Sequence, residues 1–183
     1  MKIGVVSDTH GGLKSWLDCG QFLKDTEAVI HCGDILNHGP GNPLPERYAP
    51  GELAAALNAS ETPLLMVKGN CDSEVDQLFL SVPLASPLLV YQVDFLKIVA
   101  SHGHHFPEDE WLALGRKWGA DILISGHTHR PSVQHRDGLV LLNPGSTALP
   151  KDGPASLAVI DVHLREIQIF DILNLSLIAQ TKF

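Results

Sequence analysis

Five short segments of this 183-residue chain place carboxylate, amide or imidazole side chains directly after apolar runs. Carboxylate and imidazole donors without converging thiolates suit Mn, Fe, Zn, Co or Ni rather than Ca or a structural zinc site built from cysteines. These residue types therefore predict a catalytic metal centre. The segments are SDTH at 7–10, GD at 33–34, GNCD at 69–72, SHGHH at 101–105 and GHTH at 126–129.

The number of donors predicts two metal ions rather than one. The residues that would supply terminal ligands are Asp8, His10, Asn70, His102, His127 and His129. These exceed what one catalytic ion with an open position can use, and Asp34 as a shared carboxylate would complete two four-ligand sites. Two cations about 3.5–4 Å apart can clamp a phosphoryl oxygen and activate a hydroxide between them.

The elements that must position these residues alternate between strand and helix in the first half of the chain. Apolar runs at 2–6, 28–31 and 64–67 predict buried strands, and helices are predicted at 13–23 and 51–59. Continuous apolar strands separated by helices are typical of parallel β-α-β units. Since ligands bind at the carboxyl ends of strands in such sheets, the candidate residues should meet at one edge.

The second half is richer in strands, and it contains one predicted helix at 108–119. Strands are predicted at 87–93, 95–101, 121–125, on both sides of an Asp-Gly turn within 133–143, and at 156–162, 166–172 and 175–180. Trp16, Trp111 and Trp118 are expected in the core. The pattern predicts an α/β fold in which two mixed sheets pack together and helices lie outside.

Length and composition favour one globular domain over 1–183. The formal net charge of -8 argues against a nucleic-acid-binding surface, which needs clustered positive charge.

The N-terminal apolar run is too short for a signal peptide or a membrane span, so a cytoplasmic location is expected. The Pro/Gly-rich segment 36–50 predicts an insertion loop, either a lid or a plain surface insert.

In their order, these motifs resemble those of the calcineurin-like metallophosphoesterase superfamily. The small size, the GNCD variant and NPGS at 143–146 resemble the small single-domain bacterial phosphodiesterases of the YfcE type. The resemblance implies a four-layer α/β/β/α sandwich and hydrolysis of a phosphodiester by a hydroxide that bridges two divalent metals, with manganese expected first. It implies that one metal is held by Asp8, His10, Asp34 and His129, and the other by Asp34, Asn70, His102 and His127.

Cys71 departs from the family pattern. Many members have a histidine after the metal-binding asparagine, where it is thought to protonate the leaving oxygen, and Cys71 stands at that position.

His31, inside a predicted strand, is expected to be a core or supporting histidine rather than a ligand. The candidate catalytic residues are Asp34, Asn70, Cys71 and His104, and the candidate substrate contacts are Asn37, His38 and His105. Gly145 and Ser146 either line the site or only form a turn.

Three functions are compatible with the sequence. The first is a phosphodiesterase acting on a small or nucleotide-like substrate, and the second is a phosphomonoesterase or protein phosphatase on the same bimetal site. The third is a non-catalytic scaffold, because a scaffold subunit of the retromer complex has this fold. The intact set of seven ligand positions argues against the scaffold. No membrane partner is expected, and the apolar C-terminal strands either pair with a second copy or belong to the core.

Overall fold

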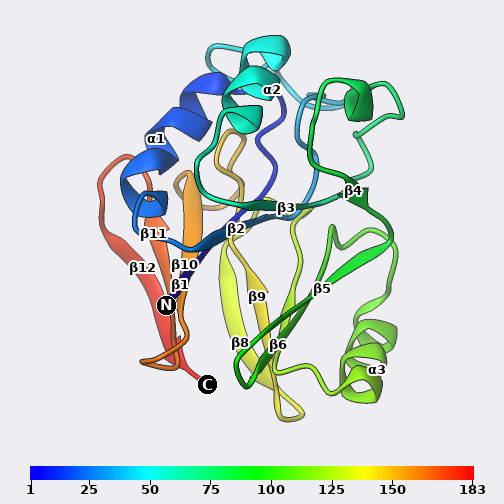
Figure 1. Cartoon of the computed structure of the whole chain (residues 1–183), viewed down its shortest axis with the longest axis vertical. Helices are drawn as coiled ribbons and strands as arrows, with labels where there is room; N and C mark the ends of the chain where they lie inside the picture. Colours follow the sequence, from blue (N-terminus) through cyan, green and yellow to red (C-terminus); the bar gives the residue numbers. More distant parts are fainter.

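Two mixed β-sheets dominate the computed structural model, which describes residues 1–183 (Figure 1). The seven-stranded sheet contains β1 (Lys2–Val6), β2 (Ala28–His31), β3 (Leu64–Val67), β4 (Leu84–Ala85), β10 (Ser156–Asp161), β11 (Glu166–Asp171) and β12 (Leu177–Lys182). The five-stranded sheet contains β5 (Leu88–Val93), β6 (Leu96–Ser101), β7 (Ile122–Ile124), β8 (Ser132–Arg136) and β9 (Leu139–Asn143).

Parallel strands form one side of the seven-stranded sheet and the middle of the five-stranded sheet. The first sheet has the order β12-β11-β10-β1-β2-β3-β4, in which β1 to β4 run parallel and β10 pairs antiparallel with β1. The second has the order β5-β6-β7-β9-β8, in which β6, β7 and β9 are parallel. Every strand that precedes a candidate ligand segment is one of these parallel strands.

Three apolar clusters hold four layers together. The largest lies between the sheets and is built from alternate residues of both, such as Ile3, Ile98 and Ile160. A second cluster packs α1 (Leu13–Leu23) and α2 (Pro50–Asn58) on the outer face of the seven-stranded sheet, and a third packs α3 (Glu108–Trp118) on the five-stranded sheet. The layers are therefore helix, sheet, sheet and helix, and the expected four-layer sandwich is confirmed (Figure 1).

The helices begin and end where their sequences favour it. Pro50 opens α2, where its missing N–H costs nothing, and Gly119 ends α3 in the left-handed conformation with φ +62°. Acidic residues fill the first turn of α3, and Arg116 and Lys117 lie in its last turn, which suits the helix dipole. None of the helices combines the length and the apolar character that a membrane crossing requires.

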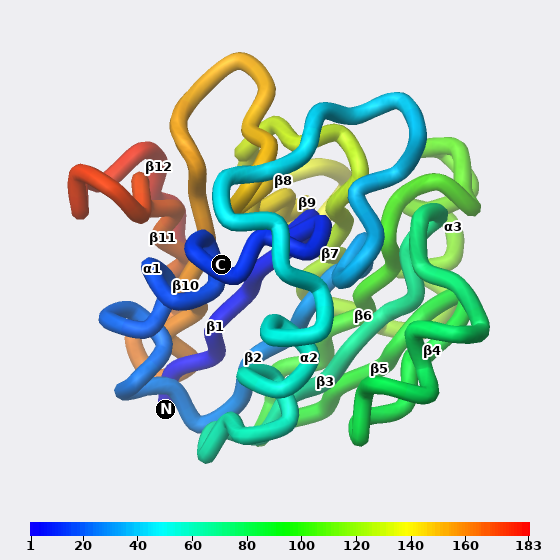
Figure 2. Tube along the Cα trace, turned by 90° about the horizontal axis from the view of Figure 1, so that it is seen from above, coloured from blue at the N-terminus to red at the C-terminus, as the bar shows by residue number.

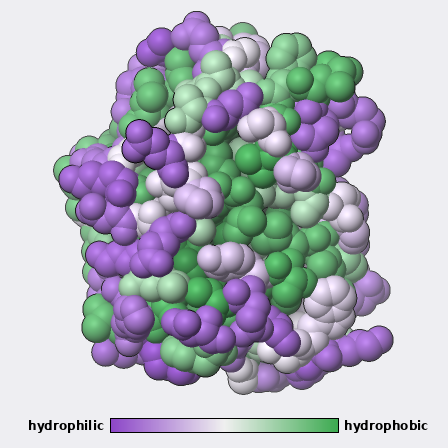
Figure 3. All heavy atoms as spheres, in the orientation of Figure 1, coloured by the Kyte–Doolittle hydropathy of each residue, from purple (hydrophilic) through white to green (hydrophobic).

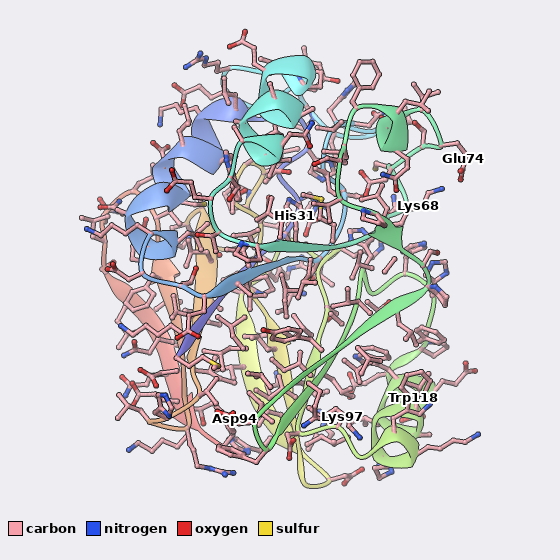
Figure 4. All side chains as sticks on the ribbon, viewed as in Figure 1. His31, Lys68, Glu74, Asp94, Lys97 and Trp118 are labelled. Atoms are coloured by element: carbon pink, nitrogen blue, oxygen red, sulfur yellow. The ribbon has the colours of Figure 1, made fainter.

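Most predicted elements are confirmed within one or two residues, with three differences. The short strand β4 and a 3-10 helix at Asp76–Leu78 were not expected, because two- and three-residue elements carry no periodicity. The expectation that Trp118 is a core residue is wrong: it is the last residue of α3, at the end of the helix, and is 42% exposed (Figure 4).

The segment 36–49 has no helix or strand, as its prolines and glycines predicted. Figure 2 shows it as a long excursion, coloured light blue to cyan, between β2 and α2. Its end is tied to the loop after β1 by an isolated bridge between Gly12 and Tyr48 and by the Ala49 N–H, which donates to the Gly11 carbonyl. The segment is therefore fixed beside the edge where the candidate ligands lie.

Apolar side chains also reach the surface along the sides of the sandwich. In Figure 3 they gather over the middle of the face on which β3 and β5 lie in Figure 1. Leu65 and Leu89, on these strands, are half-buried and pack on the central core. At the other edge of the first sheet, β12 leaves Leu177 and Ile178 exposed.

Candidate metal centre

The loops after β1, β2, β3, β6 and β7 bring the candidate ligands to one edge of the sandwich. The Nε2 atoms of His10 and His129 lie 3.2 Å apart although 119 residues separate them. His102 Nε2 lies 3.4 Å from Asp34 Oδ2 and 3.0 Å from Asn70 Oδ1. These residues therefore lie together at the carboxyl ends of the parallel strands, as the sequence predicts.

Five of the candidate ligands have left-handed backbone conformations, which non-glycine residues rarely adopt. Their φ values lie between 46° and 69°, and the residues are Asp8, His10, Asp34, His127 and His129. Such a conformation turns the chain sharply just after the end of a strand. The strain is typical of functional loops that the surrounding structure holds in place.

Three buried imidazoles are oriented alike. The Nδ1–H groups of His10, His102 and His129 donate to the backbone carbonyls of Asn37, Cys32 and Leu149, at 2.8, 2.7 and 2.6 Å. Because a carbonyl can only accept, each Nδ1 carries the proton and each Nε2 is left facing the centre. This arrangement is usual for histidines that ligate metals.

The centre of the site is short of positive charge. Asp8 Oδ1 is fully buried, has no hydrogen-bond donor, and lies 3.3 to 4.0 Å from the Nε2 atoms of His129, His10 and His102. His10 and His129 face each other with unprotonated Nε2 atoms, which repel unless a cation or a proton lies between them. An orphaned carboxylate oxygen beside converging imidazole lone pairs therefore fits a divalent cation well.

Three sets of side chains have ligand atoms within 4.8 Å of one another, close enough to bind one metal ion together. They are Asp8 with His10 and His129, Asp8 with Asp34 and His102, and His10 with Asp34 and Cys71. The sequence did not predict Cys71 as a member of such a set. Asn70 joins through its contact with His102, whereas His127 stands at the rim, exposed, with its ring centroid 5.1 Å from that of His102.

The two partners His102 and Asp34 hold a proton between them in the metal-free protein. Burial alone would lower the pKa of His102, but its contact with Asp34 and the charges of Asp8 and Asp34 raise that pKa to about 9. Burial opposes ionisation of Asp34, yet the His102 contact and the Cys71 N–H hold the pKa of the carboxyl well below its usual range. His102 is therefore protonated at neutral pH until a metal displaces the proton.

Metal affinity should accordingly rise with pH between about 6.5 and 9, roughly tenfold per unit, because one proton leaves His102 for each metal bound beside it. Isothermal titration of a divalent metal in two buffers of different ionisation enthalpy at pH 7.5 should report about one proton released. A His163→Gln variant, changed in the turn between β10 and β11, should release the same number. Zero proton release in the wild type would contradict the assignment of the proton to His102.

The NPGS segment supports the site from behind rather than lining it. The Ser146 hydroxyl is buried and donates to the Asp8 carbonyl, while the Asn143 side chain donates to the Gly126 carbonyl and to Thr128 Oγ1. The same loop supplies the Leu149 carbonyl that orients His129. The alternative that Gly145 and Ser146 line the site is therefore wrong, and the segment acts as a brace for two ligand loops.

Two further buried residues fix the loop after β2. Asp72 accepts the backbone N–H groups of Asp34, Ile35 and Gly69 at 2.8, 2.7 and 2.7 Å. Burial raises the pKa of Asp72 to about 6 against the effect of these donors. His31 accepts from the Gly33 N–H and lies 3.0 Å from Thr9 Oγ1, so the prediction of a supporting histidine inside the molecule is confirmed (Figure 4).

Glycine at 69 and 126 lets the ligand loops approach one another. A Cβ at Gly69 would lie 2.1 Å from Asp34 Oδ1, and a Cβ at Gly126 would lie 2.0 Å from Ser7 Oγ and 2.9 Å from Asp8 Oδ2. Any larger residue would push the carboxylates out of place. The glycine in each of the G-N and G-H motifs therefore has a steric cause.

Four of the residues proposed for catalysis or substrate contact lie around the rim: Asn37, His38, His104 and His105. His104 and His105 are exposed, and their rings stack with centroids 3.8 Å apart. Partial desolvation of the ring and the neighbouring histidines lower the pKa of His104 to about 4, so the ring is neutral at pH 7 in the metal-free protein. Asn37 contributes its backbone carbonyl to His10, and His38 packs edge-on against Tyr48 within the same loop.

Comparison with known proteins agrees with this geometry. A family model described as the calcineurin-like phosphoesterase superfamily domain matches residues 1–165. The phosphodiesterase YfcE of Escherichia coli is 38% identical over 164 residues, which are 88% of each chain. Its solved structure superposes with a TM-score of 0.85 over 99% of this chain and 98% of that one. The phosphodiesterase MJ0936 of Methanocaldococcus jannaschii is 28% identical over 91% of this chain and 96% of its own.

Proposed function

This chain belongs to the calcineurin-like phosphoesterase superfamily, and from that premise we propose that it is a metal-dependent phosphodiesterase. The observation that carries the proposal is the buried, donor-free Asp8 Oδ1 among three imidazoles whose Nδ1 protons are already engaged. Relatives named phosphodiesterases at 38% and 28% identity support the diester as substrate. A small phosphodiester is the proposed partner.

The proposed ligand sets share Asp34. One ion would be held by Asp8, His10, Asp34 and His129, and the other by Asp34, Asn70, His102 and His127, with manganese as the proposed metal. Divalent ions bound there would supply Lewis acidity to a phosphoryl oxygen and lower the pKa of a water molecule. Since Asp8 and Asp34 are the only anionic residues among the proposed ligands, the loaded site would be net positive and would attract an anionic diester despite the charge of -8 on the whole chain.

Cys71 is poorly suited to protonate the leaving group. Burial and the Asp34 charge raise the pKa of its thiol to about 12, and Gly39 of the segment 36–49 lies against its sulfur. Asn70 Nδ2 also lies 3.3 Å from Sγ. The chain therefore offers no strong general acid at the position after the asparagine, which favours substrates whose leaving groups need no proton.

Replacing Cys71 by alanine should change the turnover of a dialkyl phosphate by less than about threefold, whereas loss of a general acid costs about 10²–10⁴-fold. The rate is measured on this unactivated diester and on bis(4-nitrophenyl) phosphate, whose leaving group needs no proton. A loss of 10²-fold or more (about the lower end of that range) confined to the dialkyl ester would show that Cys71 is the acid after all.

The function itself is tested after metals are removed with a chelator. Turnover of bis(4-nitrophenyl) phosphate and 4-nitrophenyl phosphate is then compared with and without added Mn²⁺. Diester turnover that returns with metal and exceeds monoester turnover supports the proposal. Faster monoester turnover would favour a phosphomonoesterase, and full metal occupancy without turnover would favour a scaffold, for which the fold alone suffices.

A further inference from the structure

A cavity of about 320 Å³ lies beside the metal centre, on the outer face of the five-stranded sheet. One wall includes Gly103 and Thr128, which are chain neighbours of proposed ligands, and Ser125, which lies two residues before His127. Its floor includes Leu123 and Leu141, and α3 closes one side through Trp111. The volume falls at the lower end of the range of small-molecule sites, about 300–1,000 Å³.

A series of aromatic rings leads from the metal centre to this cavity. The centroid of His104 lies 5.3 Å from that of His102, His105 follows at 3.8 Å, and Phe106 at 6.1 Å. Phe106 then stacks on Trp111 at 5.5 Å, with an angle of 11° between the ring planes, and both line the cavity. His104 and His105 are exposed and Phe106 is half-buried, so their ring faces can bind other flat rings, whereas Trp111 is only 7% exposed and supports Phe106 from behind.

Apart from one carboxylate, the polar side chains of the cavity are neutral, and several of them have no hydrogen-bond partner. The side chains of Ser125, Ser132 and Gln134 make no hydrogen bond within the chain, although they line the cavity. Glu108 is the one charged lining residue, and Arg136 pairs with it. An amide and two hydroxyls with free donors and acceptors suit the edge of a polar ring, and nothing there would attract a second anionic group.

We propose that this cavity, which we call the Phe106 cavity, binds a planar aromatic substituent of the diester, a ring with hydrogen-bonding groups on its edge such as a nucleobase. The inference rests on the proposed phosphodiesterase function, because the metal centre would bind the phosphate of the same substrate. The substituent that remains on phosphorus extends along the ring series, and the cavity takes its ring. The protein thereby favours nucleoside-bearing diesters over small alkyl ones.

Two other cavities fit such a group less well. One of about 230 Å³ is lined by Tyr48 and Phe79 but holds the carboxylate of Asp76, which, unlike Glu108, pairs with no basic side chain. The other, of about 320 Å³, lies near Lys14 and is lined by three carboxylates and several prolines, without an aromatic ring. Phe79 therefore provides a matched control for Phe106.

Binding of the ring is tested first in the metal-free protein, where no catalysis occurs. Adenosine is titrated into ¹⁵N-labelled protein and the three tryptophan indole N–H signals are followed by NMR, with ribose as the control ligand. We expect adenosine to shift the Trp111 signal, ribose to leave it unchanged, and Trp16 and Trp118 to serve as internal references. A shift of the exposed Trp118 alone, or of none of the three, would overturn the proposal.

Variants separate the cavity from general effects on folding. Phe106→Ala should abolish the Trp111 shift, and Gln134→Ala, on the exposed edge strand β8, should weaken it without a folding cost. Gln92→Ala is the matched control, since Gln92 is exposed on β5 at the opposite edge of the same sheet. Equal effects of Gln134→Ala and Gln92→Ala would count against the proposal.

Kinetics then distinguish the cavity from the catalytic function. The 4-nitrophenyl ester of adenosine 5′-monophosphate and methyl 4-nitrophenyl phosphate release the same phenol. Phe106→Ala should lower kcat/KM for the nucleoside ester about tenfold and leave the methyl ester unchanged, whereas Phe79→Ala should affect neither. If the wild type cleaves neither ester, the proposed function fails while the indole shifts still decide the cavity. Cleavage of both with no preference and no shift would overturn the cavity alone.

Discussion

Asp34→Asn is expected to abolish tight binding of both metals and to lower diester turnover by more than about 10³-fold. Asp34 Oδ2 lies 3.7 Å from His10 Nε2 and 3.4 Å from His102 Nε2, so one carboxylate oxygen faces both proposed ligand sets. An amide keeps the shape but loses the charge that would be shared between two cations. The loss should therefore exceed that of changing a ligand of one ion alone.

Metal content per chain is the deciding measurement, taken after dialysis against buffer of known metal concentration. Asp94→Asn is the matched control, because Asp94 has φ +48° and Asp34 has φ +55°, conformations that asparagine tolerates equally. Asp94 lies in the turn between β5 and β6, near the lower end of the molecule and well away from His31 (Figure 4). Retention of two ions per chain in Asp34→Asn would refute the shared role.

The fold was predictable because its elements carry strong periodic signals. Continuous apolar runs such as 2–6 and 28–31 become parallel strands buried on both faces, and the Asp-Gly pair at 137–138 forms the turn between β8 and β9 with both residues at positive φ. The position of Trp118 was not predictable from helical spacing, because periodicity cannot say where a helix extends beyond the sheet it covers.

The candidate ligands were predictable because each lies within a few residues of a strand end. The groups that orient these ligands were not predictable. The imidazole Nδ1–H groups donate to the backbone carbonyls of Cys32, Asn37 and Leu149, and every residue type has such a carbonyl. The roles of Asp72 and Ser146 depend on loops from distant parts of the chain. Their motifs, GNCD and NPGS, were visible, but the partners they bind were not.

The ligand loops combine strain with long-range restraint. Left-handed conformations at five ligand residues cost free energy, of order 1–3 kcal/mol for each strained residue. Hydrogen bonds across the fold offset this cost: Ser146 holds the Asp8 carbonyl, Asn143 holds the Gly126 carbonyl, and Asp72 holds the backbone of Asp34. The side chain that forms hydrogen bonds with the most backbone groups should therefore contribute most to holding the site in place.

Asp72 is that side chain, because it accepts three backbone N–H groups. Asp72→Ala should lower the free energy of unfolding by about 3–5 kcal/mol, since these three buried N–H groups lose their acceptor. Asp72→Asn should cost less, since its amide oxygen can still accept from Asp34 and Gly69 while its NH₂ group faces the Ile35 N–H. The measurement is urea unfolding of the metal-free protein, so that metal binding does not enter the comparison.

Metal affinity provides the second measurement, because Asp72 accepts no hydrogen bond from a proposed ligand side chain and acts through the backbone N–H groups of Asp34, Ile35 and Gly69. The ordering of wild type, Asp72→Asn and Asp72→Ala in stability should therefore reappear in metal affinity. Asp76→Ala is the control, since Asp76 lies four residues away and its side chain accepts a single N–H, that of Ser73. If Asp72→Asn were as stable as the wild type yet bound metal as weakly as Asp34→Asn, Asp72 would be a ligand in its own right rather than the residue that positions one.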